Sequence, residues 1–137
     1  MQKTQNKKFI IGAIFLLSIY FPIKVLGLTK DIEISELTKC NIKGIGTALK
    51  MFKLDNGIYP SIKEGLGALM KNPNFKKYPN YAASSYLNKV VVDSWQNPFI
   101  YICYKTEKGD DFQLISFGAD GKYGGEGEDE DIVYPNR

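Results

Sequence analysis

The sequence predicts an α+β domain in which one long helix packs on a small antiparallel β-sheet. Two patterns indicate this fold: helix-spaced apolar residues over 31–54, and later short segments rich in aromatic and β-branched residues. A third pattern, an apolar run behind a basic start, separates residues 1–28 from a globular domain at 29–137. At 137 residues and 44% hydrophobic content, the chain can form one compact domain with an appendage.

The N-terminal segment is predicted to direct or anchor the protein. Residues 1–8 are polar and basic, and residues 9–23 are almost entirely apolar. This is the pattern of a cleaved secretory signal, for which residues 25–27 resemble a small-residue cleavage site. Extended to Leu28, the same run is long enough for an uncleaved membrane anchor. Both alternatives place the rest of the chain outside the cytoplasm, because the basic start stays inside.

The predicted long helix covers residues 31–54. Its expected inward face is Ile34, Leu37, Asn41, Ile45, Ala48, Leu49 and Phe52. Residues 55–57 are predicted to end the helix, with Asn56 or Gly57 suited to a left-handed C-cap. Gly44 and Gly46 either weaken the helix, by about 1 kcal/mol each relative to alanine, or permit close packing on the sheet.

Shorter elements are predicted to follow the helix. Ser61 can cap a short helix over residues 62–71, with Ile62, Leu66, Leu69 and Met70 facing inward. The expected strands are residues 86–92, 99–104 and 112–117. A turn at 93–98 separates the first two strands, and a hairpin near Lys108–Asp110 joins the last two.

The composition argues against several functional classes. The chain has no histidine, so the commonest general base and the commonest zinc ligand are absent. We therefore expect a protein that is not an enzyme. Arg137 is the only arginine and the lysines are scattered, so no nucleic acid partner is expected. Cys40 and Cys103 are too far apart for a metal or redox motif; they are either two buried thiols or one disulfide.

Residues 118–131, GADGKYGGEGEDED, alternate glycines with acids. Glycines allow a tight loop whose carbonyl oxygens turn inward, and carboxylates supply further oxygen ligands. That combination suits calcium rather than zinc, although the spacing is not that of an EF-hand. The alternative is a solvated acidic tail, and the spacing alone does not choose between the two.

Three separated segments resemble one family in the same order. They are ALKMFKLDNGIYPSIKEGLGALM at 48–70, DSWQNPFIY at 93–101 and SFGADGKYGGEGEDEDI at 116–132. The chain is thereby identified as similar to the type II secretion system protein G family, the major pseudopilins. The resemblance implies a pseudopilin-like fold and a structural subunit of a type II secretion system. It also implies other pseudopilins as partners, an inner-membrane location and a globular domain in the periplasm.

The same resemblance implies a calcium ion in the C-terminal loop. Matching positions make the side chains of Asp120, Asp129 and Asp131 ligands, together with the backbone carbonyls of Leu114 and Ser116. Glu130 stands where many relatives carry a small residue and is a possible extra ligand. In the middle motif, Trp95, Asn97 and Pro98 are expected to shape the turn, and simple core packing is the preferred role of the Trp95 ring.

The N-terminus departs from the family pattern. Residues 8–12 replace the Gly-Phe-Thr-Leu-Leu-Glu-like cleavage site, so the glycine before Phe9 and the glutamate used in polymerisation are missing. This departure favours an alternative function: a stand-alone exported or membrane-anchored binding or accessory module with a pseudopilin-like domain that does not polymerise.

Overall fold

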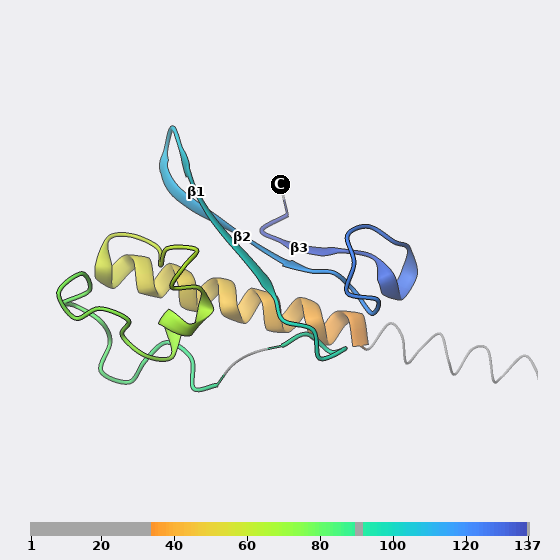
Figure 1. The fold of residues 1–137 in the computed structure, drawn as a ribbon, viewed down its shortest axis with the longest axis horizontal. Coiled ribbons are helices and arrows are strands. Elements are labelled where there is room, and N and C mark those ends of the chain that lie inside the picture. The colour runs from red at the N-terminus through yellow and green to blue at the C-terminus, as the bar shows by residue number, and fades with distance from the viewer. Residues whose placement is uncertain (1–33, 90–91, 137) are drawn as a thin grey trace, which may run out of the picture. The chain divides into compact units, whose positions relative to one another are not determined.

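The structure, a computed structural model, describes residues 34–89 and 92–136. It confirms the predicted architecture of one long helix on a small antiparallel sheet (Figure 1). The elements after the helix are η1 (Leu66–Leu69), β1 (Ile100–Thr106), β2 (Gly109–Ser116), η2 (Gly127–Asp129) and β3 (Ile132–Tyr134). The strands lie in the order β1-β2-β3. The predicted signal or anchor at residues 1–28 falls outside the described residues.

The long helix is described from residue 34 and ends at residue 56. Its buried face is formed by Thr38, Ile42, Ile45, Ala48, Leu49 and Phe52. The prediction was wrong for Leu37, which is 56% exposed, because the stripe anchored at Ile45 continues backwards to Ile42 and Thr38 instead. The helix runs two residues beyond the predicted end at 54. Of the two predicted C-cap residues, Gly57 takes the left-handed conformation: its φ is +80°, and its N–H donates to the Lys53 carbonyl at 2.8 Å. Within the described ranges, no helix combines the length and apolarity needed to cross a membrane.

The sheet is a hairpin with one short strand added. β1 and β2 pair from Thr106↔Gly109 to Ile100↔Ile115 across a two-residue turn, so the last two predicted strands are confirmed. β3 pairs antiparallel with the end of β2 and was not predicted.

The predicted strand at 86–92 is wrong for the part that is described. Residues 86–89 form no strand, and Val92 makes only an isolated bridge with Pro98. The N–H groups of Tyr86 and Leu87 both donate to the Leu69 carbonyl, at 2.8 and 2.9 Å, so their hydrogen bonds go to η1 and not to the sheet.

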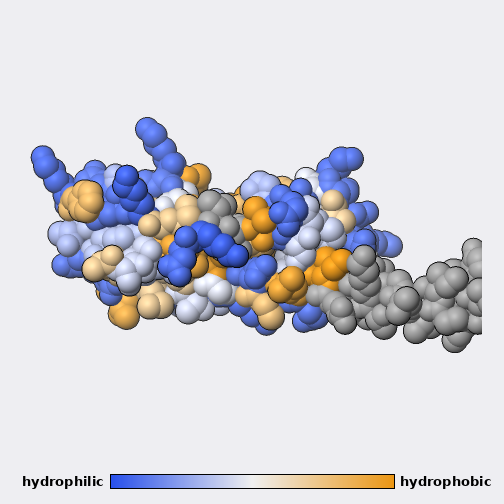
Figure 2. Space-filling model, turned by 90° about the horizontal axis from the view of Figure 1, so that it is seen from below, coloured by the Kyte–Doolittle hydropathy of each residue, from blue (hydrophilic) through white to orange (hydrophobic). Residues whose placement is uncertain are grey.

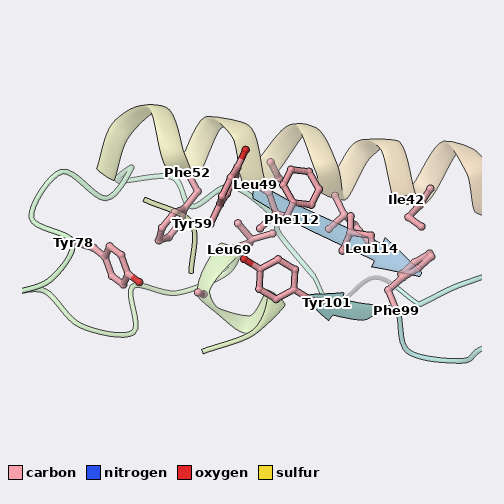
Figure 3. Packing of buried hydrophobic residues seen from close by; sticks show 13 residues of the cluster. Ile42, Leu49, Phe52, Tyr59, Leu69, Tyr78, Phe99, Tyr101, Phe112 and Leu114 are labelled. Atoms are coloured by element: carbon pink, nitrogen blue, oxygen red, sulfur yellow. The ribbon is translucent and has the colours of Figure 1, made fainter. Parts of the chain in front are cut away.

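The core lies between the helix and the sheet (Figure 3). Apolar side chains from both elements are almost fully buried: Ile42, Ile45, Leu49 and Phe52 from the helix, and Tyr101, Phe112 and Leu114 from the sheet. The ring of Tyr59, just past the helix, packs edge-on against Phe112 at a centroid distance of 5.0 Å. Burial of these side chains is the main stabilising term for the domain.

One glycine lets β3 approach the helix closely. A Cβ atom added at Gly46 would overlap the ring of Tyr134, whereas one added at Gly44 would meet nothing within 4 Å. Lys50, one helical turn beyond Gly46, donates a hydrogen bond to the Tyr134 hydroxyl at 3.2 Å. Of the two roles predicted for these glycines, close packing therefore applies to Gly46 and not to Gly44.

The segment after the helix is only partly as predicted. Ser61 caps the next turn: its N–H and hydroxyl donate to Glu64 Oε2, and the Glu64 N–H bonds back to Ser61 Oγ. The predicted helix over 62–71 is wrong in extent, because Gly65 takes φ +59° and only the short η1 follows. Ile62 is 60% exposed rather than inward, whereas Leu69 is buried as predicted.

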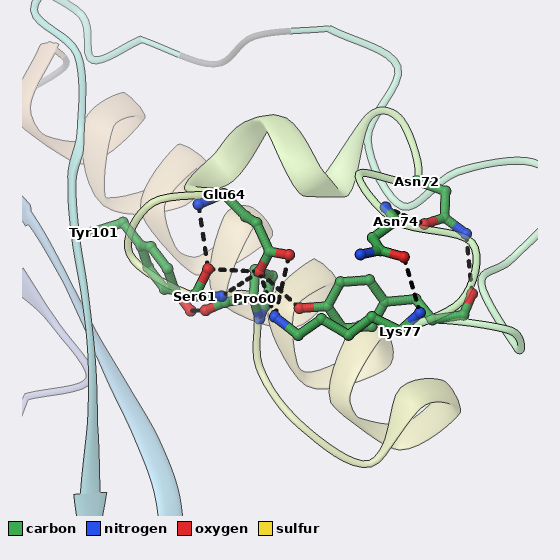
Figure 4. Close-up of polar contacts among 8 residues, drawn as sticks. Pro60, Ser61, Glu64, Asn72, Asn74, Lys77 and Tyr101 are labelled. Carbon is green, nitrogen blue, oxygen red and sulfur yellow. Dashed lines mark hydrogen bonds and ion pairs between the residues drawn. The ribbon is translucent and has the colours of Figure 1, made fainter.

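Glu64 is the centre of a polar cluster under this segment (Figure 4). Its Oε2 accepts from the Ser61 N–H at 2.8 Å, the Ser61 hydroxyl at 2.6 Å, Lys77 Nζ at 2.9 Å and the Tyr78 hydroxyl at 2.7 Å. Burial alone raises the pKa of Glu64, but hydrogen bonds from Ser61, Lys77 and Tyr78 outweigh it and lower the pKa to about 2. The ionised Glu64 side chain therefore links Ser61 to Lys77 and Tyr78 through hydrogen bonds.

Alanine substitutions at the two helical glycines are expected to act in opposite directions. Gly44→Ala raises the free energy of unfolding by about 0.5–1 kcal/mol, because alanine favours the helix and the site is open. Gly46→Ala lowers it by about 1–2 kcal/mol net, because the new methyl group displaces the Tyr134 ring. Urea unfolding of the two variants measures this difference. Equal stabilisation by both substitutions would show that β3 does not press on the helix.

Glu64 is expected to make stability depend on pH in the acid range. Since its folded pKa, about 2, lies below the ordinary 4.5, its contribution is complete above about pH 5. That contribution, at most roughly 3 kcal/mol, is lost as the pH falls from 4.5 towards 2. The stability difference between the wild type and Glu64→Gln should shrink over this interval in urea unfolding. Glu36→Gln, a change in the exposed pair with Lys39, is the control and should leave the pH profile nearly unchanged.

Candidate functional site

The acidic loop, residues 117–131, runs from the end of β2 to the start of β3 and carries η2 (blue in Figure 1). It doubles back on itself, since the Ala119 N–H donates to the Glu128 carbonyl at 2.9 Å. Gly118 and Gly125 have φ +61° and +97°, and a Cβ on either would lie within 2.6 Å of the Asp129 backbone. Only glycine fits at these two positions, because the Asp129 backbone lies directly against them. The first arm of the loop, from Gly118, and the second arm, which ends at Asp131, are therefore in contact.

Four of the five predicted ligands come from neighbouring parts of the chain. Leu114 and Ser116 are buried on β2. In the pairing with β3, Leu114 is opposite Tyr134 and Ser116 is opposite Ile132. Asp131 directly precedes Ile132 in the sequence, so it lies next to this pairing. The Asp129 backbone packs against the loop glycines described above.

Asp131 is the acidic-loop residue whose side chain has an unpartnered buried oxygen. Its Oδ2 accepts a hydrogen bond from the Gly124 N–H at 3.1 Å. Its Oδ1 is buried and has no hydrogen-bond partner. A buried carboxylate oxygen without a partner is costly and normally binds a water molecule or a cation. Calcium binds oxygen donors of this kind together with backbone carbonyls, so the chemistry of this carboxylate fits a calcium ligand.

The remaining predicted positions are more exposed. Asp120 lies on the surface, and its Oδ1 accepts from the Lys122 N–H at 2.9 Å. Glu130 is exposed just after η2. Among residues 34–89 and 92–136, no three His, Cys, Asp or Glu side chains gather closely enough to hold a metal by themselves. The ligand set, which combines three carboxylates with two carbonyls, stays a prediction.

The turn at residues 93–97 contains site residues that the sequence analysis missed. Asp93 is only 2% exposed. Its Oδ1 accepts from the N–H groups of Trp95 and Asn97 at 3.0 and 2.8 Å, and its Oδ2 accepts from the Ser116 hydroxyl at 2.6 Å. An aspartate that opens a turn and bonds the backbone two residues on is a recognised sequence signal, but the partner at Ser116 is not visible from the sequence.

The same turn contacts two other parts of the fold. Asn97 Nδ2 donates to the Gly118 carbonyl at the start of the acidic loop, at 3.0 Å. The hydroxyl of Thr38, which is buried on the long helix, donates to Ser94 Oγ at 2.8 Å and accepts from the Ser94 N–H at 3.1 Å. The expected core packing of Trp95 is wrong: its side chain is half-buried and lies outside the core cluster, while its backbone serves the turn.

The cysteines fit neither prediction completely. Both are free thiols: Cys103 is half-buried on β1, whereas Cys40 is exposed on the long helix. The alternative of two buried thiols is therefore wrong for Cys40.

The surface seen from below shows apolar side chains in separate areas among hydrophilic ones (Figure 2). The large exposed apolar residues of the described ranges include Leu54, Ile62, Phe75 and Tyr123. Single exposed side chains of this kind are ordinary and do not by themselves mark an interface.

The family model for type II secretion system (T2SS) protein G matches residues 25–135. The chain belongs to this family. Curated family members include a type II secretion system core protein G of Pseudomonas aeruginosa, 48% identical over 97 residues, covering 70% of this chain and 67% of that protein. That of Aeromonas hydrophila is 30% identical and covers 96% of this chain and 94% of its own length. The match to the Vibrio cholerae protein, 37% identical, covers 62% of that protein.

A solved structure supports the same assignment. The major pseudopilin from the type 2 secretion system of enterohaemorrhagic Escherichia coli superposes with a TM-score of 0.60 at 26% identity. The superposition covers 77% of this chain and 90% of that one. The protein G fold is therefore present here, and the predicted resemblance is confirmed.

Proposed function

We propose that this protein is a structural subunit of a type II protein secretion system and not an enzyme. The match of residues 25–135 to the protein G family carries the proposal, and the helix-on-sheet fold supports it. The partners are other pseudopilins or secretion-system components. The N-terminal segment, basic and then apolar, holds the protein at the inner membrane with its globular domain in the periplasm.

The proposal includes a calcium ion that stabilises the acidic loop. Its support is the buried, unpartnered Oδ1 of Asp131, next to the strand pairing that involves Ser116. Asp120, Asp129 and Asp131 hold the ion, and the carbonyls of Leu114 and Ser116 complete its shell. The ion offsets the repulsion among closely spaced carboxylates and so favours the closed loop.

A second function is favoured by one specific observation. Residues 8–12 lack the glycine before Phe9 and the glutamate that the resemblance assigns to polymerising family members. An exported or anchored accessory module that shares the domain but does not polymerise is consistent with that difference.

Chelation is expected to destabilise the protein. A ligand at about 100 times its dissociation constant stabilises by about 2.7 kcal/mol, so removal of calcium should lower the melting temperature by roughly 10 °C for a domain of this size. Asp120→Ala should abolish the difference between calcium and chelator. Glu126→Ala removes the same charge from the same loop at a position that is not a predicted ligand, and should preserve the difference. A wild-type melting curve that chelator leaves unchanged refutes the structural calcium.

The two functions predict different mature proteins in the cell. A fibre subunit should start at Phe9 and crosslink to other pseudopilins at native expression, whereas an accessory module should start near Leu28 or keep Met1. Mass spectrometry of the mature chain, together with crosslinking in intact cells, measures both. A chain starting near Leu28 without any crosslink would exclude the fibre subunit.

A further inference from the structure

We propose that the turn at residues 93–97 positions the acidic loop, and that Asn97 and Asp93 thereby set its affinity for calcium. This inference rests on the calcium site proposed above. Neither residue is a metal ligand; each acts on the loop through a hydrogen bond.

Asp93 fixes the turn itself and the end of β2. Its carboxylate is buried and uses both oxygens, Oδ1 for two backbone N–H groups of the turn and Oδ2 for the Ser116 hydroxyl. The Asp93 N–H also donates to the Asn97 carbonyl at 2.9 Å. Hydrogen bonds to a charged, buried acceptor are short and strong, so the position of Ser116 is tied to the turn. The carbonyl of Ser116 is one of the predicted calcium ligands.

Asn97 holds the start of the acidic loop at Gly118. Its Nδ2 donates to the Gly118 carbonyl at 3.0 Å. A Cβ atom added at Gly121 would lie 3.5 Å from Asn97 Oδ1, so the amide also lies at packing distance from the segment around Asp120. The amide thus bonds the loop on one side of that predicted ligand and lies near the loop on the other side.

The turn is itself held by the long helix. Thr38 is fully buried and exchanges hydrogen bonds with the hydroxyl and the N–H of Ser94. A rigid helix therefore supports the turn, and the turn supports a loop whose glycines give it little stiffness of its own. Residues that orient metal ligands in this way typically change metal affinity by about 10–100-fold when they are removed.

Calcium titration of the full-length Asn97→Ala protein tests the proposal. The dissociation constant is measured by calorimetry at a temperature where circular dichroism shows the fold intact, and the melting temperature is measured in chelator. We expect at least about 10-fold weaker calcium binding than in the wild type, with the melting temperature in chelator nearly unchanged. Asn88→Ala, the same change at an exposed position before the turn, is the control and should bind calcium like the wild type.

A purely structural role of Asn97 makes the opposite prediction: a lower melting temperature in chelator and an unchanged dissociation constant. Such a result, or affinity within about threefold of the wild type, overturns the positioning role and leaves the calcium site standing. If the wild-type protein does not bind calcium, the proposed calcium site fails and this inference fails with it. If Asn97→Ala does not fold, Ser116→Ala decides by the same affinity criterion, because it breaks the bond to Asp93 but keeps the Ser116 carbonyl.

Discussion

The pairing of β3 with β2 depends on closing a loop, residues 117–131, that contains six carboxylates and one lysine. The β1–β2 hairpin alone would be marginally stable, because two strands have too little apolar surface to bury. β3 adds the third strand and carries Tyr134, whose ring rests on Gly46 and whose hydroxyl accepts from Lys50. Closure of the loop is thus coupled to the contact between the sheet and the long helix.

Electrostatic repulsion acts against that closure. Carboxylates within one short loop repel one another most strongly where solvent is excluded, and Asp131 has one oxygen buried without a partner. Two features favour the closed form. The glycines let the two arms touch, and the turn at 93–97 holds the first arm through the bond from Asn97 to the Gly118 carbonyl. A bound calcium ion would supply the missing counter-charge.

The sequence predicted the elements whose determinants are local. The long helix shows in its apolar spacing and its glycine cap, and the β1–β2 hairpin shows in its composition and turn. β3 escaped prediction because three residues carry no periodic pattern and its partner lies on the far side of the acidic loop. Residues 86–92 have the composition of a strand, but strand composition does not provide a pairing partner, and the backbone N–H groups of Tyr86 and Leu87 bond Leu69 instead.

The candidate site was predictable to a similar degree. The acidic loop was visible from its composition, and the predicted calcium ligands came from the family resemblance. Asn97 was predicted only to shape the turn, and Asp93 was given no role. Their contacts with the acidic loop and β2 were not predicted because the atoms they hold, in Gly118 and Ser116, lie 21 and 23 residues away in the sequence. Hydrogen bonds over such separations are set by the fold and not by any local pattern.

Anomalous scattering from crystals of the protein grown with calcium would show whether a cation closes the acidic loop. We expect one calcium ion about 2.3–2.6 Å from Asp131 Oδ1, with the carbonyl of Ser116 in the same coordination shell. A closed loop in which Asp131 Oδ1 binds only water or a protein donor, with no anomalous peak beside it, would exclude calcium as the cause of closure.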